Sequence, residues 1–328
     1  MQSKGRILSG MRPTGRLHIG HLNVLEYWVN LQNEYDCFFF IADLHALTTA
    51  FDETGFIREN TKEMVADWLA AGLDPEKSVL FVQSSIPEHC ELHLLFSMFT
   101  PLSWLERVPT YKDQINQFKE QGKDIMTYGF LGYPLLQAAD ILMYRANAVP
   151  VGEDQAPHVE FTREVARRFN YLYRPVFPEP QTKLARIPTL PGIDGRKMSK
   201  SYANDIGMTA AVDELKGKVN GMITDPARIH KTDPGRPEVC TVYKYHGFYS
   251  TDKIVSIEED CLAGKIGCVA CKRSLADNIE SRLAPIRERR SEIMGRRGYL
   301  EDVIREGNKK AKVQAAETMS LVREAMRI

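Results

Sequence analysis

The stretch RILSGMRPTGRLHIGH, residues 6–21, joins a short apolar run to the start of a helix, and this junction decides the fold. The apolar run, residues 6–10, has the length of a buried strand. Pro13 and Gly15 then form a turn, and a helix begins near Ile19. We therefore predict a strand, a turn and a helix in direct succession.

Three further apolar runs repeat the strand pattern along the first two thirds of the chain. They are CFFFIADLHAL (37–47), SVLFVQS (78–84) and AVPVG (148–152). Helical patterns lie between the runs, and one of these patterns ends at Gly72. Strands that recur with helices between them predict an α/β fold with a doubly wound, Rossmann-like parallel sheet. Such a sheet binds ligands at the carboxyl ends of its strands.

A chain of 328 residues is long enough for two domains of unequal size. A polar segment at about 105–130 fits no strand–helix unit and looks like an insertion between two halves of the sheet. After about residue 205 helical patterns replace the strand signal. We expect a sheet domain at 1–204 and an all-helical domain at 205–328.

Charge and hydropathy limit the partners that the chain can have. Lys plus Arg equal Asp plus Glu at 43 each, which argues against a protein that simply coats nucleic acid, and we expect no DNA partner. Residues 272–328 carry 14 Lys and Arg against 9 Asp and Glu. Solvated helix faces account for most such charges, but a basic end also suits an RNA partner. No apolar run reaches the ~18 residues of a membrane span or forms a signal peptide, so we expect a cytoplasmic protein without a membrane partner.

Two histidines mark the start of the predicted first helix. His18 and His21 lie three positions apart, so their rings share one helix face. Gly20 between them has no side chain, which allows a flat ring to approach the backbone. A helix N-terminus also favours phosphate groups. A histidine pair is more often a hydrogen-bonded structural pair, so a second signal is needed.

The second signal is GRKMSKS, residues 195–201. Lys197 and Lys200 place two cations three positions apart, and Ser199 and Ser201 add hydroxyl groups. Loop lysines are usually only solvated. Both segments together, in this order and with a nucleotide-type sheet between them, form a much rarer combination that indicates phosphate binding.

HIGH (18–21) and KMSKS (197–201) are the two signature sequences of class I aminoacyl-tRNA synthetases, and this chain resembles that family. The resemblance implies a catalytic domain at 1–204 in which four side chains hold the ATP phosphates and stabilise charge during amino-acid activation. These catalytic candidates are His18, His21, Lys197 and Lys200. The resemblance also implies an ATP-binding set, with Asp154 at the ribose and two of the residues beside the adenine. This set is Arg12, Thr14, Gly20, Asp154, Met198 and Ser199.

The reaction implied by this resemblance needs no protein nucleophile. The carboxylate of the amino acid attacks the α-phosphorus of ATP, and pyrophosphate leaves. Catalysis then rests on positioning and on cations placed where charge develops. We expect Mg²⁺ to bridge the phosphates, because this ion is normally held partly through substrate oxygens.

The segment FLGYPLLQAADILMY (130–144) resembles the tryptophanyl-tRNA synthetases, as do FIADLHALTT (40–49) and GEDQ (152–155). The resemblance implies that Asp140 accepts the indole N–H and that Tyr133 binds the substrate's amino group. The substrate-binding candidates are Leu8, His45, Tyr133, Gln137, Asp140 and Gln155. From the residues alone, His45 is about equally well explained as a hydrogen-bonded core histidine. The corresponding alternative for the other two residues is that Tyr133 is a core aromatic residue and Asp140 a solvated carboxylate.

The activity implied by the resemblance is that of a tryptophan–tRNA ligase, which makes tryptophanyl-AMP and pyrophosphate from L-tryptophan and ATP and then charges tRNA(Trp). A tyrosyl-tRNA synthetase is the first alternative, because a tyrosine hydroxyl can also satisfy an aspartate. Another nucleotidyltransferase with a HIGH-type motif is the second. The resemblance also implies a homodimer, with anticodon recognition by residues 205–328.

Four cysteines in the helical region have the spacing C-x20-C-x6-C-x2-C. They are Cys240, Cys261, Cys268 and Cys271. Four thiolates can hold one Zn²⁺ or a [4Fe-4S] cluster, and the uneven spacing suits the larger group. A subset of bacterial tryptophanyl-tRNA synthetases resembles this chain in carrying such a pattern for a [4Fe-4S] cluster. We therefore predict iron–sulfur first and zinc second, as a scaffold for tRNA binding rather than for activation. A non-catalytic iron–sulfur protein is the alternative.

Overall fold

The computed structural model of the chain describes residues 3–120, 122–184, 190–199 and 202–328. The chain forms two compact units. Unit 1 comprises residues 1–15, 26–186 and 296–328, and unit 2 comprises residues 16–25 and 187–295. The boundary between the units does not fall after residue 204. Unit 2 already includes residues 187–204, and the last helix belongs to unit 1, which contains the sheet. The functional domains at 1–204 and 205–328 stay a prediction.

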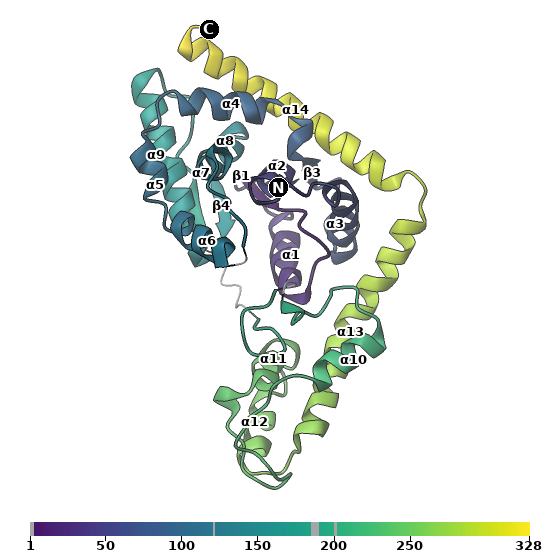
Figure 1. Ribbon diagram of the computed structural model, residues 1–328. Coiled ribbons are helices and arrows are strands. Elements are labelled where there is room, and N and C mark those ends of the chain that lie inside the picture. Colours follow the sequence, from purple (N-terminus) through teal and green to yellow (C-terminus); the bar gives the residue numbers. More distant parts are fainter. Residues whose placement is uncertain (1–2, 121, 185–189, 200–201) are drawn as a thin grey trace. The chain divides into compact units, whose positions relative to one another are not determined.

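A five-stranded parallel sheet forms the centre of unit 1, in the order β3-β2-β1-β4-β5. Figure 1 labels β3, β1 and β4 of this sheet. The strands are β1 Arg6–Met11, β2 Asp36–Ile41, β3 Ser78–Val82, β4 Ala148–Val151 and β5 Gln181–Leu184. Along the chain, β2 and β3 are added on one side of β1, and β4 and β5 are then added on its other side. This order confirms the predicted doubly wound fold, in which ligands bind where the order reverses.

Helices connect and cover the strands of unit 1. They are α2 Asp43–Ala50, α3 Ile57–Ala71, α4 Glu88–Ser97, α5 Leu102–Glu106, α6 Pro109–Glu120, α7 Tyr128–Leu131, α8 Tyr133–Met143, α9 Ala156–Leu172 and α14 Tyr299–Met326, with short 3-10 helices η1 Gln83–Ser85 and η2 Glu153–Gln155. Helix α1 (Ile19–Leu31) begins in unit 2 and ends in unit 1, and its first residue is the predicted one. Helix α3 ends before Gly72, whose φ of 113° is a conformation that favours glycine.

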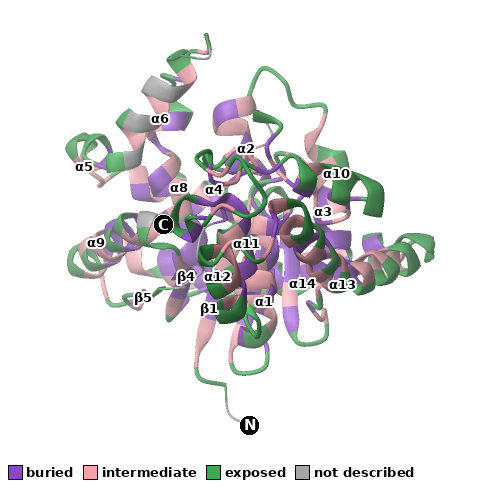
Figure 2. Cartoon of the chain, turned by 90° about the horizontal axis from the view of Figure 1, so that it is seen from below, coloured by how far each residue is buried: buried purple, intermediate pink, exposed green. Residues whose placement is uncertain are grey.

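Strand β2 shows how the sequence supports a sheet that is covered on both faces. Successive side chains of a strand point to opposite faces, and every residue of β2 after the first is buried. Phe39 stacks on Trp28 of α1, with ring centroids 4.5 Å apart. Phe38 stacks on Tyr144, which follows α8, at 4.9 Å. Figure 2 shows buried residues along strands of this sheet. An unbroken run of apolar residues is what such a central strand requires.

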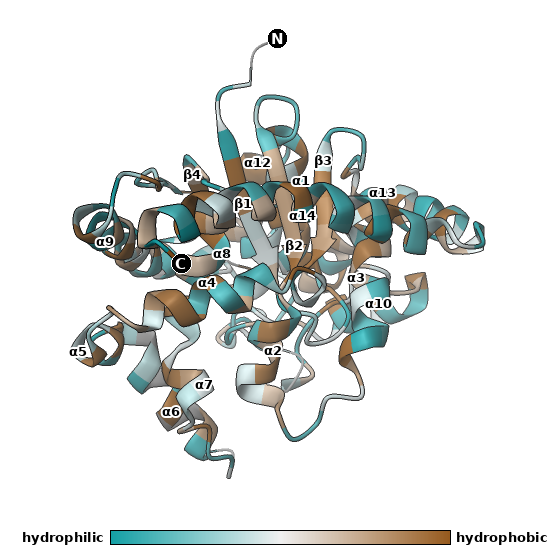
Figure 3. Ribbon diagram, turned by 90° about the horizontal axis from the view of Figure 1, so that it is seen from above, coloured by the Kyte–Doolittle hydropathy of each residue, from teal (hydrophilic) through white to brown (hydrophobic). Residues whose placement is uncertain are grey.

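Helix α14 packs along the edge strand β3 and also contacts α4 and α8. A β-carbon at Gly307 would collide with the carbonyl group of Leu80, so the glycine permits the close approach. The next side chain, Asn308, accepts a hydrogen bond from the backbone N–H of Val82 at 2.9 Å. Figure 3 shows both hydrophobic and hydrophilic residues along α14. The helix therefore satisfies part of an edge that would otherwise be open to another strand.

Two strand predictions need correction. The run 37–47 is not one strand, because β2 ends at Ile41 and α2 begins at Asp43, whose carboxylate accepts the N–H of Leu44 at the helix start. Strand β5 was not predicted, because its four residues are exposed or half-buried and show no apolar pattern. The predicted insertion at about 105–130 contains α6 and overlaps the end of α5 and most of α7.

Unit 2 is helical beyond residue 205, as predicted. Its helices are α10 Val212–Asn220, α11 Thr241–Tyr249, α12 Ile254–Leu262 and α13 Cys268–Gly295, with the 3-10 helix η4 Pro237–Val239. Helix α13 packs against α10 and α11. Within the described ranges, none of the helices combines the length and the apolar character needed to cross a bilayer.

Candidate active site

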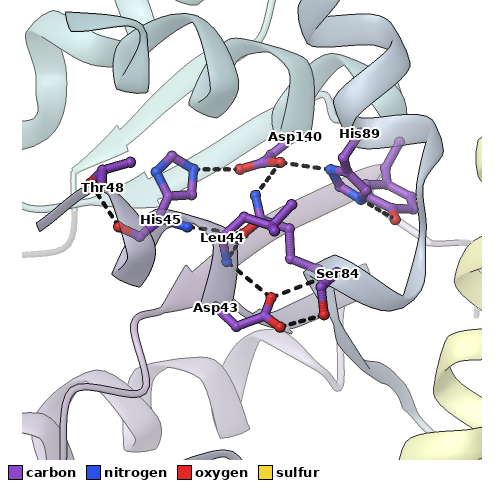
Figure 4. Close-up of polar contacts among 9 residues, drawn as sticks. Asp43, Leu44, His45, Thr48, Ser84, His89 and Asp140 are labelled. Atoms are coloured by element: carbon purple, nitrogen blue, oxygen red, sulfur yellow. Dashed lines mark hydrogen bonds and ion pairs between the residues drawn. The ribbon is translucent and has the colours of Figure 1, made fainter. Parts of the chain in front are cut away.

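Asp140 is the centre of a buried polar cluster in unit 1. It lies on α8, and its side chain has no exposed surface. Its Oδ2 accepts a hydrogen bond from His45 Nε2 at 2.8 Å, and its Oδ1 accepts one from His89 Nδ1 at 2.6 Å. Figure 4 shows the two imidazole rings on opposite sides of the carboxylate. The prediction that Asp140 and His45 belong to one site is consistent with this contact, but Asp140 is not the solvated carboxylate of the alternative interpretation.

Gln83 and Tyr144 complete the cluster around Asp140. Gln83 follows β3, and its Nε2 donates to Asp140 Oδ1 at 2.8 Å. The hydroxyl of Tyr144 lies 2.8 Å from His89 Nε2. Sequence analysis missed Gln83, His89 and Tyr144. The position of Gln83 directly after a predicted strand was the one available signal, because strand ends are where ligands bind in such sheets.

The charge of Asp140 depends on these hydrogen bonds. Burial alone raises the pKa of the Asp140 carboxyl, but the hydrogen bonds from His45 and His89 outweigh burial, and the pKa is lowered. Burial, followed by the charge of Asp140, raises the pKa of the Tyr144 hydroxyl well above its usual value. The cluster therefore holds an ionised carboxylate away from water, next to a protonated phenol.

The other predicted substrate residues also lie in unit 1. Leu8 is buried on β1, and Gln137 is half-buried on α8, one turn before Asp140. Tyr133 begins α8, and its hydroxyl lies 3.4 Å from His158 Nε2. Gln155 is half-buried at the end of η2. Their roles stay predictions.

The predicted turn after β1 holds two of the ATP-binding candidates. Arg12 and Thr14 are exposed, and the N–H of Thr14 donates to the carbonyl oxygen of Arg12 at 2.8 Å. Gly15 has a φ of 132°, which favours glycine. Asn60 of α3 donates to the carbonyl oxygen of Pro13 at 3.2 Å. The turn is thus fixed by backbone geometry and by one side chain.

The HIGH segment belongs to unit 2, where its histidines pack together. The ring centroids of His18 and His21 lie 3.8 Å apart, as expected for two residues on one helix face. The N–H of His18 donates to His21 Nδ1 at 3.2 Å, and the N–H of Gly20 donates to His18 Nδ1 at 3.2 Å. The Ile19 N–H donates to the carbonyl oxygen of Ile206 at 2.9 Å, so the segment after KMSKS holds the helix start.

The described part of the KMSKS loop also lies in unit 2. Met198 is buried, and its sulfur lies near the space where a Gly20 side chain would begin. This contact brings the two signature segments together, as the sequence analysis expected. Lys197 is exposed and Ser199 is half-buried. Lys200 and Ser201 lie outside the described residues, as does the side chain of Asp154.

The four predicted cluster cysteines interact with one another in unit 2. Burial, and then the neighbouring thiols of Cys240, Cys261 and Cys268, raise the pKa of the Cys271 thiol to about 12. Arg228 Nη1 lies 3.8 Å from the sulfur of Cys261 and 3.9 Å from that of Cys268. In the ranges that the structure describes, no group of three or more His, Cys, Asp or Glu side chains is arranged to hold a metal ion. The iron–sulfur prediction is therefore not confirmed.

The sequence and the fold are similar to those of known proteins. The family described as tRNA synthetases class I (W and Y) matches residues 1–284. The tryptophan–tRNA ligase of Thermotoga maritima is 55% identical over 98% of this chain and 99% of its own length. That of Aquifex aeolicus is 46% identical over 98% of this chain and 100% of its own length. The crystal structure of Campylobacter jejuni tryptophanyl-tRNA synthetase with ADP and tryptophan matches with a TM-score of 0.87 and 31% identity, over 98% of this chain and 100% of that chain.

Proposed function

The chain belongs to the family of class I tRNA synthetases for tryptophan and tyrosine and is a tryptophan–tRNA ligase, and on this basis we propose how its residues share the work. The reaction makes tryptophanyl-AMP and pyrophosphate from L-tryptophan and ATP. Tryptophan is then transferred to tRNA(Trp). Neither step needs a covalent enzyme intermediate, so each side chain acts by binding, orientation or charge.

Asp140 selects the indole ring in this proposal. The observation that supports this role is a fully buried carboxylate whose pKa is lowered by its two histidine partners. An ionised acceptor away from water favours a substrate with an N–H donor and penalises one that leaves the acceptor unpaired. Tyr133 and Gln155 bind the amino group and other polar parts of tryptophan, and Leu8, His45 and Gln137 line the indole pocket.

The two signature segments bind ATP. His18, His21, Lys197 and Lys200 stabilise the triphosphate as the tryptophan carboxylate attacks the α-phosphorus and the bond to pyrophosphate breaks. Gly20 and Met198 lie beside the adenine in this proposal, which is supported by the Met198 sulfur lying near the position that a Gly20 β-carbon would take. Arg12, Thr14, Asp154 and Ser199 complete the ATP-binding set. Mg²⁺, when bound, neutralises phosphate charge.

Removing one phosphate-binding cation tests the ATP assignment. We expect Lys200→Ala to lower tryptophan-dependent ATP–pyrophosphate exchange on the order of 10² to 10³-fold, because a charge contact made in the transition state is lost. Tryptophan binding, measured by calorimetry, should persist. Lys216→Ala on α10 removes an exposed lysine of the same unit and should leave exchange unchanged. Near-normal exchange in Lys200→Ala would contradict the assignment.

Cys240, Cys261, Cys268 and Cys271 hold a [4Fe-4S] cluster in our proposal, with zinc as the second choice. One guanidinium nitrogen of Arg228 lies beside the sulfurs of both Cys261 and Cys268, which supports a shared site, and four thiols are a suitable donor set for either group. The cluster, when bound, ties together the starts of α11 and α13 and the end of α12, which we propose to take part in anticodon recognition. The residues 205–328 that include these helices would then form the tRNA-binding domain.

Absorbance and metal analysis of anaerobically purified protein test the cluster. We expect a brown protein whose broad visible absorbance is lost on oxidation, and a colourless protein with stoichiometric zinc would refute iron–sulfur. Cys271→Ser should lose the colour, keep pyrophosphate exchange and impair tRNA charging. Cys90→Ser changes an exposed cysteine on α4 and serves as the control.

We also propose a homodimer. Large apolar side chains are exposed in the stretch between the two halves of the sheet, at Leu94, Met98, Leu102, Met126 and Tyr128. Such exposure is typical of surfaces that another chain covers. Sedimentation analysis should give twice the monomer mass, and Met98→Glu should shift the protein towards monomer. The cytoplasmic location stays a prediction.

A further inference from the structure

We infer that Gln83 and His89 are positioning residues that occupy Oδ1 of Asp140, so that only Oδ2 is left to accept the N–H of the indole ring. This inference rests on the proposed role of Asp140. It adds two residues to the selection of tryptophan, and these residues act through Asp140 rather than by touching the substrate.

The first step is the count of hydrogen bonds on Asp140. A carboxylate oxygen has about two acceptor positions. Among the described residues, Oδ1 accepts from Gln83 Nε2 and from His89 Nδ1, whereas Oδ2 accepts from His45 Nε2. Oδ1 is therefore saturated, and Oδ2 retains one position beside His45.

The second step concerns the direction of each hydrogen bond. The carboxylate can only accept, so Nδ1 of His89 must carry a proton. In the neutral ring Nε2 then has no proton and accepts from the hydroxyl of Tyr144, 2.8 Å away. His89 and Tyr144 have no appreciable exposed surface, so water does not replace these partners. Asp140 thus fixes the tautomer of His89, and the phenol supplies a partner for the other ring nitrogen.

The third step is the anchoring of Gln83. Its Oε1 faces the backbone N–H groups of Leu44 and His45 at the start of α2, at 3.2 and 3.4 Å. A flipped amide would direct its NH₂ group at those N–H groups and lose the bond to Asp140, so only one orientation fits. Gln83 therefore links Asp140 to the helix that carries His45.

Residues on both sides of Gln83 hold its backbone in place. Val82 donates its N–H to Asn308 at 2.9 Å, and Ser84 donates its N–H to Asp43 at 3.0 Å. The carboxylate of Asp43 also accepts the hydroxyl of Ser84. The segment has little freedom to move, which is the support that a precisely placed acceptor needs.

A substrate pair tests the inference. The probes are L-tryptophan and β-(3-benzothienyl)-L-alanine, in which sulfur replaces the indole N–H. We expect wild-type exchange to favour tryptophan in kcat/KM on the order of 10²-fold, because the analogue leaves a charged acceptor unpaired. In Gln83→Met, which keeps the length of the side chain without its amide, this preference should fall at least about tenfold, because freed Oδ1 lets the carboxylate turn.

Further variants keep the test decisive. Tyr144→Phe deletes one oxygen, retains the packed ring and leaves Nε2 of His89 without the hydrogen bond that holds the ring in place. It should therefore also reduce the preference if Gln83→Met does not fold. Thr48→Val removes a hydroxyl on α2 that bonds the carbonyl oxygen of His45 and not Asp140, and it should keep the wild-type preference. A purely structural role would lower kcat/KM for both substrates equally and leave their ratio unchanged.

The outcomes separate this inference from the proposed function. If the wild-type protein does not distinguish the two substrates, the role of Asp140 is wrong and the inference falls with it. If the wild-type protein distinguishes them and Asp140→Asn does not, Asp140 selects the N–H. If folded Gln83→Met and Tyr144→Phe then both keep the full preference, the positioning role is overturned and that of Asp140 stands.

Discussion

Asn204 holds the loop that carries Lys197 by using both ends of its side-chain amide. Its Oδ1 accepts the N–H of Ser199 at 2.7 Å. Its Nδ2 donates to the carboxylate of Asp194 at 2.8 Å and to the carbonyl oxygen of Lys197 at 3.1 Å. The residue is only 2% exposed, so water cannot replace these partners. Asn204 therefore sets the backbone from which Lys197, a proposed phosphate-binding residue, extends.

We predict that Asn204→Ala lowers kcat for pyrophosphate exchange by roughly 10 to 10²-fold, because a small displacement of a charged group is costly in the transition state. KM for tryptophan should stay near its wild-type value, since the tryptophan candidates belong to unit 1. Steady-state exchange kinetics measure both. The exposed Asn220→Ala is the matched control, and an unchanged kcat in Asn204→Ala would show that the loop does not depend on this residue.

Asp225 gives the stability of unit 2 a defined pH dependence. The hydrogen bonds from the Arg236 side chain, and then from the N–H of Ala227, lower the pKa of Asp225 to about 2 from 3.8. Because the folded-state pKa lies below the unfolded value, the stabilisation is present above about pH 4 and is lost as pH falls towards 2. The thermal unfolding midpoint of Asp225→Asn should fall less steeply with decreasing pH than the midpoint of the wild-type protein over this window. If the unfolding midpoints of the two proteins fell equally with pH, the pH dependence assigned to Asp225 would be disproved.

Local sequence identified some site residues and missed others for a physical reason. His18 and His21 stand in the HIGH motif, and Asp140 was predicted from the resemblance of residues 130–144 to a known family. Gln83 and His89 act on Asp140 from 57 and 51 positions away, and no local pattern marks them. Such residues become visible only when the fold brings α4 and the end of β3 against α8.

At the scale of elements, α14 depends on Gly307 for its approach to β3. We predict that Gly307→Ala lowers the unfolding midpoint, with a cost of about 1–3 kcal/mol, because the new methyl group meets the backbone of Leu80 and the helix must shift. Thermal unfolding followed by circular dichroism measures the change. Gly217→Ala is the control, since this α10 glycine has open space around it and alanine should stabilise the helix by about 1 kcal/mol. A Gly307→Ala protein as stable as Gly217→Ala would refute the close contact.

The strands differ in how clearly they can be predicted from the sequence. Strand β2 is buried on both faces and therefore reads as a continuous apolar run, which the sequence analysis found. Strand β5 lies at the other edge of the sheet and has polar residues, so its pairing with β4 had to come from tertiary structure. The start of α2 was hidden inside an apolar run because helix and strand cannot be separated by hydropathy over so few residues.

For the whole molecule, the alternation of strands and helices predicted the class of the fold. It did not predict which segments belong to each of the two units. Helix α14 is amphipathic, which the spacing of its apolar residues predicted, and it packs in unit 1 although it follows the helices of unit 2. The spacing of apolar residues predicts which face of a helix is buried. It does not predict which element packs against that face. The placement of residues 16–25 with unit 2 was equally beyond local patterns.

We propose that this molecule activates tryptophan through a buried carboxylate that accepts the indole N–H. ATP–pyrophosphate exchange on the purified wild-type protein, with tryptophan and tyrosine as competing substrates, tests this claim most directly. We expect exchange that depends on tryptophan and is weak with tyrosine at the same concentration. Exchange that is faster with tyrosine would contradict it.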